Sequence, residues 1–133
     1  MNIIVCVDDS LGMSFNNRRQ SKDSALVRNI MKITENNRLF VSEYSASLFK
    51  NEDVIVDNNL LENAQDGDYC FVEKSDISEA LDKIEKVIIY RWNRAYPSDK
   101  KFPLEAVTNG KTLVYSCDFA GTSHDKITME IYQ

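Results

Sequence analysis

Asn2-Ile-Ile-Val-Cys-Val-Asp8 is an almost unbroken apolar run near the start of the chain. Such a run is typical of a β-strand that is covered on both faces, because a strand with one solvent-exposed face alternates apolar and polar residues. Two more runs, at 69–72 and 86–92, have the same character. Together the three runs predict a mostly parallel sheet with helices on both of its faces.

The segments between these runs predict the remaining elements. Apolar residues return at helical spacing over 22–34, where Ser21 or Asp23 can cap the start, and again over 76–85, where Asp76 and Glu79 have the spacing of a capping box. Shorter helices are expected at 45–49 and 60–64, and strands at 38–42 and 53–57. The last two segments, 112–118 and 126–132, alternate polar and apolar residues and predict an antiparallel hairpin.

This order predicts an α/β fold with three layers, α/β/α, and a mixed sheet that ends in a C-terminal antiparallel hairpin at one edge. Residues 2–8 are expected at the centre of that sheet. The 133 residues suit a single domain, 1–133. In such sheets, ligands bind at the carboxyl ends of the parallel strands. We therefore expect a site between the loop after Val7, the start of the helix at Lys22 and the strand end 90–92.

Composition narrows the classes of function. The net charge is −5, and residues 39–85 carry 3 basic and 12 acidic side chains, which disfavours sequence-independent binding to duplex nucleic acid. No apolar run approaches the roughly 20 residues of a membrane span, and the N-terminus lacks the features of a signal peptide. The three cysteines lie in apolar runs, which is typical of reduced thiols in a cytoplasmic protein.

Several motifs in the same order resemble the dihydrofolate reductase family. Val7-Asp8-Asp9-Ser-Leu-Gly12-Met13, followed by a polar loop and then Asp23, resembles that family's first strand, its turn, its mobile loop and the single acidic residue that opens its first helix. The segments 38–49, 79–92, 99–103 and 122–132 resemble later parts of the family. The resemblance covers nearly the whole chain and implies a reductase-like fold.

The departures from the family concern its cofactor. The family has a Gly-Gly pair where the pyrophosphate of NADPH approaches the backbone, whereas this chain has Val72-Glu73-Lys74-Ser75. The family's third strand and basic loop are missing between Phe49 and Asp53, and the surrounding segment is strongly acidic. We therefore expect no NADPH binding and no other cofactor.

The chain also resembles small bacterial proteins that often carry the label ribonuclease Z. That enzyme holds two zinc ions with a histidine-rich H-x-H-x-D-H signature, whereas this chain has one histidine. No metal site is expected. Asp8 and Asp9 follow the first strand, and turn formation ahead of Gly12 is favoured over a Mg²⁺ site.

The expected site contains residues for binding an anion and an aromatic ring. Arginine forks onto phosphate or carboxylate, and tyrosine or tryptophan can stack on a base. Asp23 and His124 are the candidate catalytic residues. The candidate ligand-binding residues are Arg18, Arg19, Gln20, Tyr90, Arg91, Trp92 and Arg94. Arg18 or Arg19 is expected within reach of Arg91 or Arg94.

Three functions remain open at this point. The first is a cofactor-less reductase-like domain that binds a small anionic or aromatic ligand, similar to a nucleotide or a pterin, without NADPH-dependent reduction. The second is a metal-independent ribonuclease or RNA-binding module. The third is an acidic interaction module of the immunity type, which binds a basic protein partner. The sequence does not decide whether any reaction is catalysed, and no membrane partner is expected.

Overall fold

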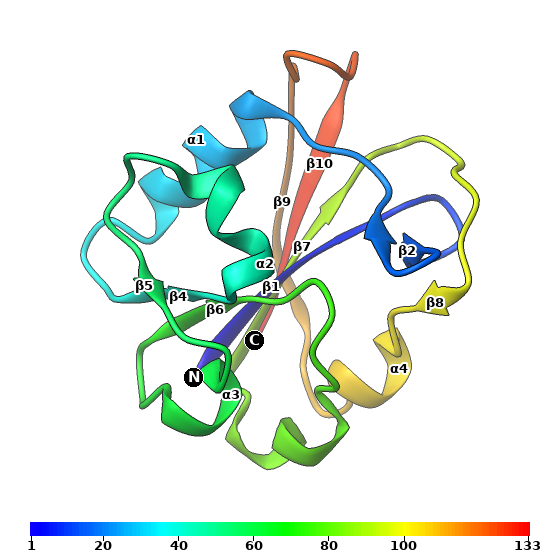
Figure 1. The fold of residues 1–133 in the computed structure, drawn as a ribbon. Helices are drawn as coiled ribbons and strands as arrows, with labels where there is room; N and C mark the ends of the chain where they lie inside the picture. The colour runs from blue at the N-terminus through cyan, green and yellow to red at the C-terminus, as the bar shows by residue number, and fades with distance from the viewer.

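The computed structural model describes residues 1–133, and its centre is a seven-stranded sheet in the order β5-β4-β6-β1-β7-β10-β9 (Figure 1). The strands of this sheet are β1 (Asn2–Val7), β4 (Leu39–Val41), β5 (Ile55–Val56), β6 (Tyr69–Phe71), β7 (Lys86–Arg91), β9 (Leu113–Phe119) and β10 (Ile127–Tyr132). The first strand lies between β6 and β7, which is the position that the resemblance to the reductase family implies.

The strands of the sheet are parallel up to β7 and antiparallel beyond it. Asn2 pairs with Tyr69 on one side and with Lys86 on the other, and both pairings are parallel. β10 pairs antiparallel with β7 and with β9, so the C-terminal hairpin forms one edge of the sheet. Its position and direction confirm the expected mixed sheet.

Helices cover both faces of the sheet, and each face has its own apolar core. On one face Ile4 packs with α1 (Ser24–Ile33), α2 (Glu43–Ala46) and the 3₁₀ helix η1 (Ser47–Phe49). On the other face, Ile3, Val5 and Val7 pack with α3 (Leu60–Asn63), the 3₁₀ helix η2 (Ser78–Lys83) and α4 (Leu104–Val107). Alternate residues of β1 therefore serve opposite layers, which confirms the three-layer α/β/α fold.

The prediction of a helix over 76–85 is wrong in the type and the length of the helix. Only Ser78–Lys83 is helical, and it is a 3₁₀ helix. The Asp76 carboxylate accepts a hydrogen bond from the Ser78 backbone N–H at 3.0 Å, which is an Asx turn rather than a capping box. The helix at α1 agrees with expectation, and Asp23 rather than Ser21 is its N-cap.

A second, small sheet, which the sequence did not lead us to expect, contacts β1. It contains β2 (Gly12–Phe15), β3 (Arg18–Arg19) and β8 (Lys100–Lys101), in the order β3-β2-β8. Asn16 and Asn17 connect β2 to β3 with φ angles of 51° and 62°, which is the backbone of a type I′ hairpin turn. The hairpin places Phe15 directly opposite Arg18. None of the helices has the length and hydrophobicity that a transmembrane span requires.

Candidate functional site

The candidate site lies at the carboxyl ends of β1 and β7, where the β2–β3 hairpin, the start of α1 and the β9–β10 loop meet. Asp23, at the N-terminus of α1, is its central charged group and is 3% exposed. Five donors hold its carboxylate: the backbone N–H groups of Ala25, Thr122 and Ser123, the Thr122 hydroxyl and His124 Nδ1. The two carboxylate oxygens therefore fasten the β9–β10 loop to α1.

The protonation state of Asp23 follows from these contacts. Burial raises the pKa of its carboxyl group, but the hydrogen bonds from His124, Thr122 and Ser123 lower it by more, so the pKa lies far below its usual range. Asp23 is therefore a carboxylate at neutral pH. Its oxygens are already occupied by the protein's own donors, which makes it a poor acceptor for a ligand.

His124 links Asp23 to two hydroxyl groups. Its Nδ1 lies 2.9 Å from Asp23 Oδ2, while its Nε2 lies 3.0 Å from Ser21 Oγ and 2.9 Å from the Tyr96 hydroxyl. The Trp92 ring stacks on the imidazole, with centroids 4.5 Å apart and an interplanar angle of 25°. The structure thus brings the two candidate catalytic residues, Asp23 and His124, into direct contact and adds Ser21 and Tyr96, which the sequence did not indicate as site residues.

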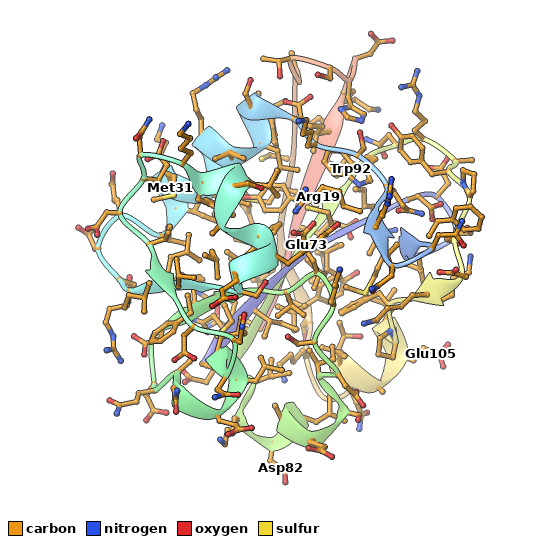
Figure 2. All side chains as sticks on the ribbon, in the orientation of Figure 1. Arg19, Met31, Glu73, Asp82, Trp92 and Glu105 are labelled. Carbon is orange, nitrogen blue, oxygen red and sulfur yellow. The ribbon has the colours of Figure 1, made fainter.

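A second polar cluster closes the crevice between the hairpin and β6. Arg19 donates to Glu73 through Nε at 2.9 Å and through Nη2 at 3.0 Å, and Ser45 Oγ donates to the same carboxylate at 2.6 Å. The Arg19 guanidinium also lies 4.5 Å from the centre of the Tyr44 ring. Figure 2 shows Arg19 and Glu73 next to one another near the centre of the molecule, with Trp92 close by.

Side chains fill most of the deep crevice behind this ion pair. The free volume that remains is about 20 Å³, room for a single water molecule. The residues around it include Cys6, Met13, Gln20, Ser21 and Trp92. Gln20 donates to Asp8 and to the Pro97 carbonyl, whereas its own buried Oε1 has no partner in the chain.

An open groove lies on the outer face of the β2–β3 hairpin. Its free volume is about 450 Å³, which is within the range of small-molecule sites. The groove is lined by Phe15, Asn16, Arg18, Arg19, Gln20, Tyr96 and Pro97, and none of these residues is acidic. Phe15 is 43% exposed, and Arg18 makes no ion pair.

The structure corrects two predicted ligand-binding residues. The Tyr90 ring is fully buried, and its hydroxyl donates to Asn29 Oδ1 at 2.6 Å, because this side chain points from β7 towards α1. Arg91 points to the opposite face and donates to Glu130 on β10 at 2.8 Å. Neither side chain reaches the hairpin groove.

The predicted cluster of four arginines does not form. Arg18 and Arg19 share the hairpin groove, but Arg19 is neutralised by Glu73. Arg94 lies over the Tyr96 ring at 6.0 Å and lines a different groove, beside His124. Trp92 is 4% exposed and contacts His124 rather than open solvent.

Asp8 has the turn role that its position ahead of Gly12 favours. Its carboxylate accepts from the backbone N–H groups of Ser10, Gly12 and Tyr96. Burial raises the pKa of the Asp8 carboxyl group, and these N–H donors lower it by more, so the net shift is downward. No three histidine, cysteine, aspartate or glutamate side chains come together in a metal-binding arrangement.

Comparison with known proteins identifies the fold. No protein-family model matches the chain, and no curated protein sequence matches it. Among solved structures the chain is similar to dihydrofolate reductase from Enterococcus faecalis complexed with NADP(H) and RAB-propyl, with a TM-score of 0.68 and 12% identity. The match covers 99% of this chain and 94% of that one. The chain therefore has a dihydrofolate-reductase-like fold, while the resemblance to proteins labelled ribonuclease Z has no support in these comparisons.

Proposed function

We propose that the protein is a cofactor-independent, dihydrofolate-reductase-like domain that binds a small anionic ligand with an aromatic ring, such as a nucleotide, in the hairpin groove. The observation that carries this proposal is the pairing of Phe15 with Arg18 across the hairpin, in a groove of about 450 Å³ without acidic lining. The exposed Phe15 ring can stack on a nucleotide base, and the Arg18 guanidinium, which has no carboxylate partner, can bind the phosphate.

Energetics favour the hairpin groove over the deep crevice. A charge-assisted hydrogen bond contributes about 1.5–3 kcal/mol, and stacking of a base on an aromatic ring about 1–3 kcal/mol. In the deep crevice, a ligand would have to displace the Arg19–Glu73 pair and enter a space of about 20 Å³. A pterin bound by the Asp23 carboxylate would have to replace one of the protein's own hydrogen-bond donors to that group. We therefore favour a nucleotide in the hairpin groove over a pterin at Asp23.

Arg18→Ala is expected to weaken the binding of adenosine 5′-monophosphate at least tenfold, because it removes one charge-assisted contact to phosphate. Isothermal titration calorimetry measures this change. Arg28→Ala is the matched control, since Arg28 is an exposed arginine on α1 outside the groove, and it is expected to bind like the unmodified protein. Adenosine, which lacks the phosphate, is expected to bind at least tenfold more weakly than the monophosphate. Equal affinities for the Arg18→Ala and Arg28→Ala proteins would contradict the proposal.

NADPH is expected to bind no more tightly than about 1 mM, and dihydrofolate reduction is expected to be undetectable. Val72 and Glu73 follow β6, and Glu73 is paired with Arg19, so a pyrophosphate approaching this backbone would have to displace that ion pair and the bulk of both side chains. Calorimetry with NADPH and the loss of its absorbance at 340 nm in the presence of dihydrofolate check these two points. Submillimolar affinity or measurable turnover would show that the cofactor function is retained.

The two alternative functions have less support. An RNA-binding surface needs several unpaired basic groups on one face, and two of the four candidate arginines are paired with Glu73 and Glu130. A ribonuclease without metal needs both a general acid and a general base. The chain has one histidine, so no pair of histidines can share these two roles. An interaction module with a basic partner rests on the acidic composition of residues 39–85 alone.

A further inference from the structure

Ser21, His124 and Asp23 form a hydrogen-bonded series in the order hydroxyl, imidazole and carboxylate. Ser21 Oγ lies 3.0 Å from His124 Nε2, and His124 Nδ1 lies 2.9 Å from Asp23 Oδ2. This is the order of contacts in a serine hydrolase triad, which is recognised by geometry and not by fold. Ligand binding in the hairpin groove does not depend on this series of contacts.

The contacts of Asp23 fix the tautomer of the histidine. Because the Asp23 carboxylate only accepts hydrogen bonds, Nδ1 of His124 carries a proton and donates it to Oδ2. In the neutral imidazole, the lone pair of Nε2 then faces two hydroxyl groups, Ser21 Oγ at 3.0 Å and the Tyr96 hydroxyl at 2.9 Å. This is the arrangement that a general base needs in order to take a proton from serine.

The orientation of the imidazole is fixed on every side. The backbone N–H groups of Thr122 and Ser123 hold the Asp23 carboxylate at 3.0 and 2.8 Å. The stacked Trp92 ring covers one face of the imidazole, and His124 is only 8% exposed. The Tyr96 hydroxyl lies 2.9 Å from Nε2, the nitrogen that Ser21 also contacts. The imidazole ring is therefore held in one orientation before any proton transfer.

Two backbone donors lie next to the serine. The N–H groups of Lys22 and Asp23, which directly follow Ser21, donate no hydrogen bond within the chain. In serine hydrolases, the N–H of the residue after the nucleophile often contributes to the oxyanion hole. Ser21 also lines the deep crevice, whose free volume is about 20 Å³.

We propose that Ser21 is the nucleophile of an acyl-transfer site that accepts small acyl esters, such as acetyl esters. Ser21 Oγ attacks the ester carbonyl carbon and transfers its proton to His124 Nε2. The bond to the leaving alcohol then breaks, and the alcohol takes that proton from Nε2. Water next attacks the acetyl-serine, with its proton passing to Nε2 and then to Ser21 Oγ, which releases acetic acid and restores the enzyme.

Covalent labelling with an alkyl fluorophosphonate, a probe that reacts with activated serines, tests the site without any ligand in the groove. The unmodified protein is expected to gain one phosphonate, and fragmentation in a mass spectrometer is expected to place it on Ser21. Hydrolysis of p-nitrophenyl acetate is expected to fall at least tenfold in Ser21→Ala. Ser47→Ala is the matched control, because Ser47 is an exposed serine that does not contact His124, and it is expected to label fully.

Circular dichroism checks that Ser21→Ala keeps the fold. Absence of labelling in the unmodified folded protein, or equal labelling of the folded Ser21→Ala variant, would overturn the proposal. Neither result would bear on nucleotide binding at Arg18.

Discussion

Replacing Asp23 by alanine is expected to lower the free energy of unfolding by about 3–5 kcal/mol, because several buried donors lose their charged acceptor and an unsatisfied buried donor costs about 1–3 kcal/mol. The substitution would leave the N–H groups of Ala25, Thr122 and Ser123, together with His124 Nδ1, without their acceptor. Urea unfolding followed by circular dichroism measures the change. Asp66→Ala, at an exposed aspartate, is the control and is expected to change stability by less than about 0.5 kcal/mol.

The contribution of the Asp23 carboxylate to the free energy of unfolding is also expected to depend on pH. The pKa of the folded carboxyl group is depressed below its unfolded value of about 3.9, so its stabilising contribution is complete above that pH and is lost as the pH falls. The difference in stability between the unmodified protein and Asp23→Asn is therefore expected to shrink from pH 5 to pH 2. A difference that stays constant over this range would contradict the role given to the carboxylate.

Gly121→Ala is expected to be destabilising by about 3 kcal/mol or more, within the range seen when a clash breaks a buried polar network. A Cβ atom at this position would lie 2.5 Å from Asp23 Oδ2 and 2.8 Å from the His124 carbonyl oxygen. Both atoms are held rigidly, so the β9–β10 loop would have to move away from α1. Thermal and urea unfolding of the variant measure the loss.

Gly110→Ala is the matched control for this substitution. Gly110 has a φ of 76°, but no atom lies within 4 Å of the place that an alanine methyl group would occupy there. Alanine at this position is therefore expected to cost only about 1 kcal/mol, through its backbone conformation. Equal losses for the two variants would show that the close approach of Gly121 to Asp23 does not determine stability.

The layers of this fold could be predicted from the sequence because each depends on a local pattern. The continuous apolar run of β1 requires cover on both faces, and Ile3 and Ile4 do pack into opposite cores. The alternation in the last two segments likewise predicts the β9–β10 hairpin. The prediction of a helix over 76–85 failed because helical spacing does not distinguish an α-helix from a short 3₁₀ helix.

The candidate site was predicted only in part, because its contacts join residues far apart in the chain. Asp23 and His124 are 101 positions apart, and no periodic pattern links them. Asn16-Asn17 is a turn signal that could have revealed the β2–β3 hairpin, and with it the pairing of Phe15 and Arg18. The filling of the deep crevice depends on side-chain packing, which residue types alone do not specify.

Titration of ¹⁵N-labelled protein with adenosine 5′-monophosphate, followed through the backbone amide resonances, tests ligand binding in the hairpin groove most directly. We expect the largest chemical-shift changes at Phe15, Asn16, Arg18 and Tyr96, which line the groove, and their loss in Arg18→Ala. Inorganic phosphate alone is expected to perturb Arg18 more weakly. Changes centred on 72–75, where the reductase family binds its cofactor, or no saturable change at all, would contradict binding in the groove.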